Sequence, residues 1–269
     1  MKSPVVVSRE YKVMLRAGKF VGTEKQLLAT ARKLWSDFAR VVEPIVFEVD
    51  GTLDTIDKQR LIVFLDSDAQ HLKEGGYIFR VRRGLDGGQP EVTLKFRHPD
   101  RYVAEARRMS GWNIDAKTKF EEDIKAPFVS LYSFSTRGRV SKKGVPTSLH
   151  DVSRLFPDLS KRIADTDDGV TLSEVNGFTA RELVITGPML RVGSTPKVHL
   201  ECALIVWYDQ NGAVDKPVAV EFSYRYGSPD GWYGGKVSRR AFNIFAAMQS
   251  DLTEWIDPNP RTKTAFVYG

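Results

Sequence analysis

Strict alternation of apolar and charged residues is the feature that most constrains the fold of this chain, and it is clearest in residues 77–84, which read YIFRVRRG. Successive side chains of a β-strand point to opposite faces, so Tyr77, Phe79 and Val81 share one face while Ile78, Arg80 and Arg82 share the other. If the arginines face water, the strand is an ordinary half-buried one. If they face inward, they require an anion, because an unpaired buried charge is strongly unfavourable.

The same alternation recurs along the chain and predicts a β-rich protein with a few helices. Thr23 followed by Gln26 is a capping-box signature, and it predicts the start of a helix that ends near residue 42. Further helices are expected at about 148–164 and 236–256, where apolar residues have helical spacing. The expected strands are 5–15, 44–49, 60–66, 77–83, 91–97, 117–124, 170–175, 180–192, 197–209 and 217–226.

Most of these strands combine an apolar face with a face of mixed charge, and two architectures fit that pattern. One is a sheet whose charged face lies in water, which periodicity alone favours because a charged strand face is usually solvated. The other is a closed barrel with a polar lumen and an apolar outer face covered by helices.

Composition narrows the ligand class and the cellular setting. The chain has 269 residues, 42% hydrophobic and 28% charged, with a net charge of +6 and a pI of about 9.3. This modest excess of positive charge favours anionic ligands. The single cysteine, Cys202, excludes a disulfide within the chain and a cysteine cluster for zinc. Because no stretch resembles a signal peptide or a membrane span, we expect a soluble, cytoplasmic protein without a membrane partner.

The chain is expected to form a single domain over residues 1–256. Residues 126–170 break the strand pattern, and they are interpreted as an inserted loop and helix that contain the basic stretch STRGRVSKKG at 135–144. Residues 257–269 are interpreted as a short polar tail, because the sequence DPNP ends the last helix.

A resemblance to a known family favours the barrel. The run FLDSDAQHLKEGGYIFRVRRG at 64–84, with Arg80-Val81-Arg82 on its second strand, resembles the signature of the CYTH superfamily, also called triphosphate tunnel metalloenzymes. VTLK, ending at Lys95, resembles the next strand of the family, and SREYK at 8–12 resembles its first. KFEEDI at 119–124 and VEFSY at 220–224 are similar to two later acidic strands. Only the order and spacing of these motifs together are specific.

The resemblance implies an α+β fold, a closed antiparallel β-barrel (tunnel) of about eight strands with flanking helices. It implies a divalent-metal-dependent triphosphatase that uses Mg²⁺ or Mn²⁺ on an inorganic or organic triphosphate. Arginine and lysine suit phosphate oxygens, and a metal ion joins carboxylates to phosphates. The implied phosphate-binding residues are Lys12, Arg80, Arg82 and Lys95. Arg181 is a further candidate for phosphate binding, because it could close one end of such a tunnel. The implied metal ligands are Glu10, Glu121, Asp123 and Glu221, and the implied catalytic residues are Glu10, Glu221 and Lys12. Glu201 is a further candidate metal ligand, because a lone glutamate in an otherwise apolar strand is either functional or paired.

Two departures from the family pattern put catalysis in doubt. Ser8 and Ser223 each stand where the family pattern has a glutamate. If those glutamates bind metal, this chain has fewer carboxylates for it. One alternative is therefore a protein that binds polyphosphate, nucleotide or RNA without turning it over. Another is an adenylate cyclase of the same family. For RNA, the basic stretch at 135–144 is the candidate surface, although it has no aromatic residue to stack on bases.

Overall fold

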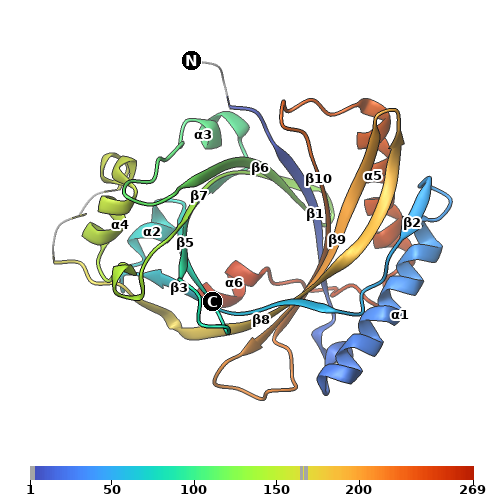
Figure 1. Ribbon diagram of the computed structural model, residues 1–269, viewed down its shortest axis with the longest axis horizontal. Coiled ribbons are helices and arrows are strands. Elements are labelled where there is room, and N and C mark those ends of the chain that lie inside the picture. Colours follow the sequence, from blue (N-terminus) through green and yellow to red (C-terminus); the bar gives the residue numbers. More distant parts are fainter. Residues whose placement is uncertain (1–3, 164–165, 167–168) are drawn as a thin grey trace.

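A closed β-barrel is the centre of the computed structural model, which describes residues 4–163, 166 and 169–269. In the described part of the chain, one sheet contains ten strands, and the pairing of β8 with β9 closes nine of them into a ring (Figure 1). The predicted barrel is confirmed, and the open sheet that periodicity alone favoured is wrong. Around the ring the strands are β8 (Ser173–Ser194), β3 (Ile56–Asp66), β4 (Tyr77–Gly84), β5 (Glu91–His98), β7 (Val129–Arg139), β6 (Lys117–Lys125), β1 (Ser8–Leu15), β10 (Ala219–Gly227) and β9 (Lys197–Asp209).

The barrel is mixed, which corrects the prediction of an antiparallel one. β1 and β6 run parallel, with Glu10 opposite Asp123, whereas the other neighbours in the ring are antiparallel. Side-chain alternation reports which face of a strand is buried and carries no information about strand direction. The sequence pattern therefore predicted the faces and missed the parallel pair.

Several predicted elements have different bounds. The strand expected at 44–49 is mostly the turn after a helix, and only β2 (Glu48–Asp50) pairs, at the edge of β8. The strands expected at 170–175 and 180–192 are one long strand, β8, which register shifts interrupt. β7 lies in the predicted insertion at 126–170 and forms part of the barrel wall. The helix expected at 148–164 is shorter, and its predicted last residue, Ala164, lies outside the described residues.

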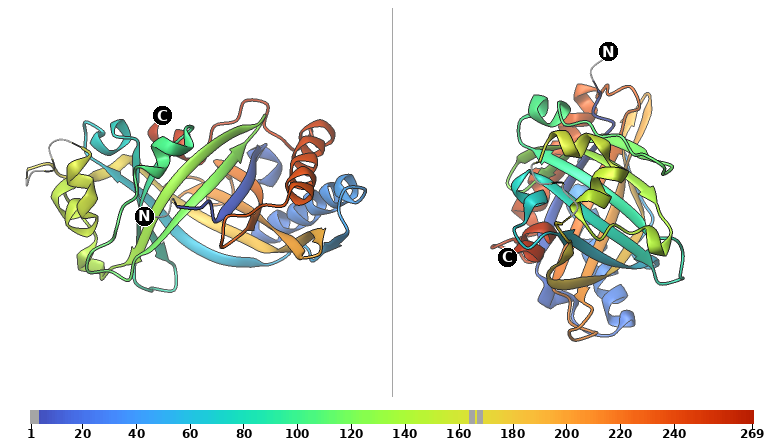
Figure 2. Two further views of the ribbon diagram at one scale, coloured as in Figure 1. Left: turned by 90° about the horizontal axis from the view of Figure 1, so that it is seen from above. Right: turned by 90° about the vertical axis from the view of Figure 1, so that its left-hand side faces the viewer.

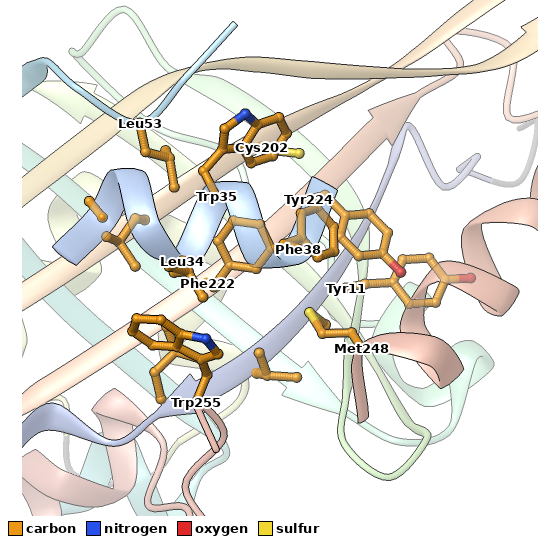
Figure 3. Packing of buried hydrophobic residues seen from close by; sticks show 14 of the residues in the cluster. Tyr11, Leu34, Trp35, Phe38, Leu53, Cys202, Phe222, Tyr224, Met248 and Trp255 are labelled. Atoms are coloured by element: carbon orange, nitrogen blue, oxygen red, sulfur yellow. The ribbon is translucent and has the colours of Figure 1, made fainter. Parts of the chain in front are cut away.

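Two long helices cover one side of the barrel. They are α1 (Glu24–Val42) and α5 (Gly235–Asp251), and the predicted capping box of Thr23 and Gln26 is present at the start of α1. Phe38 of α1 is fully buried, with its ring centroid 4.8 Å from that of Phe222 on β10 (Figure 3). The apolar face of these strands therefore lies under helices, and the charged face must point into the barrel.

Short helices cover the opposite side (Figures 1 and 2). They are α2 (His71–Glu74), α3 (Arg101–Glu105) and α4 (Leu149–Leu155), with 3₁₀ turns at Lys142–Gly144 and Pro157–Lys161. A further 3₁₀ turn, Ala17–Phe20, packs beside α1 instead. Leu72, Ala104 and Val152 of these helices pack in one cluster with Phe79 and Leu94 of the barrel wall. The apolar face of β4 and β5 is thus the outer one.

A last helix, α6 (Lys263–Tyr268), lies across one end of the barrel (Figures 1 and 2). Val267 and Tyr268 are buried there in a cluster with Phe64 and Trp207, and the Tyr268 hydroxyl donates to Asp66 at 3.3 Å. The expectation of a polar tail at 257–269 is therefore wrong. A helix of six residues is too short to show a period in the sequence.

Candidate functional site

The lumen of the barrel contains charged side chains on most of its strands. Because the outer faces pack under helices, the alternate positions point inward. Some of these lumen-facing groups retain access to solvent, such as Lys12, whose side chain is 18% exposed, and Glu10, at 27%, whereas Asp123 and Glu221 are buried. The predicted site residues that the structure brings into the lumen are Glu10, Lys12, Arg80, Arg82, Lys95, Glu121, Asp123 and Glu221.

Strand register places these residues along the barrel axis. Trp207 pairs with Ala219 at the end that α6 covers, and Glu201 pairs with Arg225 toward the other end. At the far end the Glu201 and Arg225 side chains are 62% and 56% exposed, and they form an ion pair of 2.8 Å. Glu201 is thus a rim residue that is already paired. The open end of the lumen is opposite α6.

Asp123 is the centre of a cationic cluster. Its carboxylate lies 3.0 Å from Lys12, 3.0 Å from Lys95 and 3.3 Å from Arg97. Burial alone would raise the pKa of Asp123, but these three cations hold it well below its usual range. Arg97 was not among the predicted site residues, although it shares the face of Lys95 in the sequence.

Glu10 and Lys12 form a second pair in the middle of the lumen. The Lys12 ammonium lies 2.8 Å from Glu10 and therefore bridges Glu10 and Asp123. Burial opposes ionisation of Glu10, but Lys12 lowers the pKa of its carboxyl below the usual value, helped by a hydrogen bond with Ser223. Ser223, which replaces a glutamate of the family pattern, thus supports Glu10 in its ionised form.

A third ion pair, absent from the prediction, lies near α6. Glu182 of β8 accepts from Arg60 at 2.5 Å and from the indole N–H of Trp207 at 2.7 Å. Burial would raise the pKa of Glu182, but Lys263, Arg60 and Arg82 lower it to about 2. Its signal in the sequence was a glutamate in an otherwise apolar strand, the same signal that drew attention to Glu201.

One wall of the lumen holds donors that have no partner. In the described part of the chain, five buried side-chain atoms lack a hydrogen-bond partner, and all five lie on the neighbouring strands β4, β5 and β7. We call this set the donor wall; its atoms are Arg80 Nε, Arg82 Nε, Thr93 Oγ1, Arg97 Nε and Ser133 Oγ. Buried polar groups in folded proteins are normally hydrogen-bonded, so five such atoms on one wall indicate a place for a ligand that accepts hydrogen bonds.

Electrostatics of the donor wall point to an anion. Burial and the neighbouring Arg82 hold the pKa of Arg80 well below its usual range, and burial and Arg60 lower that of Arg82. Burial also lowers the pKa of Lys95. No hydrogen bond or salt bridge joins Arg80 to another described residue. A bound anion would relieve both the desolvation of these cations and their mutual repulsion.

Two predicted site residues are not available to bind a ligand in the lumen. Arg181 lies on the outer face, where it donates to the carbonyl of Val214 at 2.6 Å and its guanidinium carbon lies 4.3 Å from the centre of the Tyr208 ring. The prediction that Arg181 binds phosphate in the tunnel is therefore wrong, because its position in β8 has the parity of the apolar outer residues. Glu221 is in the lumen, but it accepts from Lys263 of α6 at 2.9 Å.

The predicted metal ligands do not fit a preformed Mg²⁺ or Mn²⁺ site. Within the described ranges, no three histidine, cysteine, aspartate or glutamate residues come together where they could hold a metal ion. Asp123, Glu10, Glu221 and Glu201 each have a basic partner within about 3 Å. Glu121 is the loosest, at 3.9 Å from Lys119.

The basic stretch at 135–144 is divided between two places. Ser135 and Arg137 belong to β7 and share the inward parity of Ser133, and Arg137 lies 3.6 Å from Glu91 of the lumen. Lys142 and Lys143 lie in a 3₁₀ turn outside the barrel. The stretch is therefore not one continuous loop surface, which weakens the RNA-binding alternative.

Comparisons with known proteins give structural neighbours only. No family model and no curated protein matches the chain. A candidate adenylyl cyclase from Hippeastrum, described as having a dominant triphosphatase activity, is 11% identical with a TM-score of 0.46, and the match covers 95% of this chain and 93% of that one. A candidate adenylate cyclase from Bacillus halodurans is 11% identical with a TM-score of 0.40, over 99% of each chain.

A third structure, a candidate adenylate cyclase from Vibrio parahaemolyticus, is 10% identical with a TM-score of 0.36 over 100% of each chain. Adenylate cyclase and triphosphatase are the activities that the sequence resemblance implies for its family. At such low identities and TM-scores, these similarities carry no argument about this chain. Separately, no helix in the described residues is long and apolar enough to cross a membrane.

Proposed function

We propose that the protein binds a triphosphate-containing small molecule inside the barrel and hydrolyses its terminal phosphoanhydride bond. The donor wall is the observation that carries this proposal. Its five unpartnered buried atoms are all able to donate a hydrogen bond, and three of them belong to arginines. A linear triphosphate offers many acceptor oxygens and several negative charges in a compact form.

The positions of the cations suit a chain of phosphates. Arg80 and Arg82 follow each other along β4, and Lys95 lies on the neighbouring strand, opposite Ile78. Arginine binds phosphate oxygens two at a time through its planar fork, and lysine adds a compact charge. The phosphates would lie against β4, β5 and β7.

Glu10 and Lys12 of β1 are the residues that we assign to the attack of water on the terminal phosphate. Glu10 is ionised, partly open to solvent and held by Lys12, so we assign it the orientation of the attacking water. The water oxygen forms a bond to the terminal phosphorus, and the bridging P–O bond breaks. Its electron pair stays on the diphosphate product, while Glu10 takes one proton from the water. The arginines of the donor wall stabilise the charge on the transferring phosphoryl group, which is how most catalysis of phosphoryl transfer arises.

The direct test is phosphate release from tripolyphosphate and from nucleoside triphosphates, assayed with Mg²⁺, with Mn²⁺ and with chelator. Arg80→Ala is expected to lose most activity while keeping the fold. Arg181→Ala removes the same type of side chain from the outer face, and it is expected to retain activity. Equal loss in both variants, or an inert wild type, would contradict hydrolysis in the lumen.

Binding without turnover is the second candidate function. The observation in its favour is that Ser8 and Ser223 replace glutamates of the family pattern and that the remaining carboxylates are ion-paired. A wild type that binds tripolyphosphate tightly and releases no phosphate would support it. Formation of a cyclic nucleotide with release of diphosphate would instead support the cyclase alternative.

A further inference from the structure

We propose that the lumen binds its polyphosphate ligand as the free anion, without a divalent metal ion bridging ligand and protein. This inference rests on the proposed function, since it concerns how the same site holds the same class of ligand. It departs from the metal-bridged binding that the sequence resemblance implies.

The first step is the state of the carboxylates. A carboxylate that recruits Mg²⁺ needs a free oxygen directed at the ligand, and the metal is usually held by one or two such groups together with substrate phosphates. Asp123 is surrounded by three cations within 3.3 Å. Glu10 shares one of those cations, and Glu221 is bound by Lys263. The protein's own ammonium and guanidinium groups thus already neutralise these carboxylates.

The second step concerns which groups in the lumen are free to bind a ligand. The unpartnered atoms are donors on β4, β5 and β7, and none of them belongs to a carboxylate. Arg97 and Arg82 reach Asp123 and Glu91 through their other nitrogens, so their Nε atoms are the ones left for a ligand. A phosphate oxygen satisfies a donor directly, whereas a metal ion next to Arg80 and Arg82 would be repelled. The donor wall therefore suits the bare oxygens of a polyanion.

The third step is the position of Lys12. Its ammonium lies between Glu10 and Asp123, 2.8 Å from one carboxylate and 3.0 Å from the other. A cation that bridged those two carboxylates would occupy the same space. Lys12 therefore has the place and the charge that a bridging metal would have, and unlike Mg²⁺ it is covalently part of the chain.

Titration calorimetry with tripolyphosphate, in chelator and in excess Mg²⁺, tests the inference in the wild-type protein. We expect tight binding in chelator and binding that is no tighter in Mg²⁺, because Mg²⁺ competes with the protein for phosphate oxygens. Binding that is at least about tenfold tighter in Mg²⁺, which corresponds to about 1.4 kcal/mol, would overturn the inference and leave the proposed function standing. No binding under either condition would overturn both.

A carboxylate variant separates the two models by the sign of its effect. If Glu10 were a metal ligand, Glu10→Gln would weaken binding. In the metal-free model this change removes a negative charge from the lumen and releases Lys12, so tripolyphosphate binding in excess Mg²⁺ should tighten a few-fold, whereas loss of a metal ligand would weaken it. Glu48→Gln is the control, since Glu48 is an exposed carboxylate paired with Arg191 outside the lumen, and it should leave the dissociation constant unchanged. Weaker binding of the Glu10 variant in excess Mg²⁺ would contradict the inference.

Discussion

Arg80 is the residue at which fold and function oppose each other most clearly. Its side chain lies in the lumen beside Arg82, its Nε has no partner, and burial holds its pKa well below the usual range. An unpaired charge in such a place destabilises the folded state. The arrangement is understandable only if an anion occupies the lumen when the protein works.

Replacing Arg80 with an apolar residue should therefore stabilise the free protein and weaken its binding. We expect Arg80→Met to raise the free energy of unfolding by about 1 kcal/mol, because replacing buried charge with hydrophobic groups is often stabilising. Tripolyphosphate binding should weaken by about 10- to 100-fold, the effect of losing hydrogen bonds to a charged group. Urea unfolding and calorimetry check the two effects, with Arg181→Met as the control for binding. A destabilised variant that binds normally would show that Arg80 is a structural residue.

The lowered pKa of Glu182 gives a prediction of how the stability of the fold depends on pH. Its pKa is about 2 in the folded protein, against about 4.3 in an unfolded chain. As the pH falls, the Glu182 carboxyl of the unfolded chain is therefore protonated before that of the folded protein. The contribution of Glu182 to the stability of the folded state is thus complete above about pH 5 and is lost as the pH falls toward 2. Glu182→Gln should be less stable than wild type by about 2 kcal/mol at pH 7, and the difference should shrink toward pH 2. Urea midpoints between pH 2 and 7 measure it, and a constant difference would refute the assignment.

At the scale of elements, α6 is the part whose role is least visible in the sequence. It covers one end of the barrel through Val267 and Tyr268, and its Lys263 reaches Glu221 inside. Without α6, the apolar residues Phe64 and Trp207 would lose their cover. The helix therefore stabilises the barrel and leaves the opposite end as the way into the lumen.

The aromatic residue at the end of α6 gives a stability prediction. Tyr268 is 8% exposed, its ring centroid lies 6.3 Å from that of Phe64, and its hydroxyl binds Asp66. Tyr268→Ala should lower the free energy of unfolding by about 3 kcal/mol, as large-to-small changes in a core do. Tyr102 is 77% exposed, and Tyr102→Ala should change stability by less than about 0.5 kcal/mol. Similar small effects in both variants would mean that α6 does not pack firmly on the barrel.

Strands were predictable where one face is buried and the other is charged. The alternation in β4 and β5 predicted both the element and the side on which Arg80 and Lys95 lie. β7 was missed because its inward residues, such as Ser133 and Ser135, are small and polar, so the segment resembles a loop. Arg181 was misplaced because both faces of this part of β8 carry one charged residue among apolar ones, Glu182 on one face and Arg181 on the other, so alternation does not show which face is inward.

The candidate site was partly predictable for the same reason. Residues of a given strand can be assigned to a face, but the pairing of Asp123 with three cations depends on the parallel contact of β1 and β6 and on the order of β5 and β7. The unpartnered state of Thr93 and Ser133 is a property of the closed ring. No local pattern in the sequence reports it.

The whole molecule is a barrel in which most apolar residues face outward, under helices, and most charged residues of the strands face inward. Inward apolar residues such as Phe64 and Trp207 lie at the end that α6 covers. This arrangement is unusual for a soluble domain, because the charges that would otherwise lie in water surround a narrow space. Carboxylates on β1, β6 and β10 pair with lysines, and unpaired donors lie on β4, β5 and β7. Under the proposed function, this asymmetry assigns the anion to the donor wall and the attacking water to the side of Glu10.

A crystal structure of the protein with tripolyphosphate, grown in the presence of a chelator, tests the central claim most directly. The account predicts phosphate density inside the barrel, with oxygens at about 3 Å from the Nε atoms of Arg80, Arg82 and Arg97 and from the hydroxyls of Thr93 and Ser133. Density on the outer surface, for example at Lys142 and Lys143, or an unliganded donor wall at saturating tripolyphosphate, would contradict it.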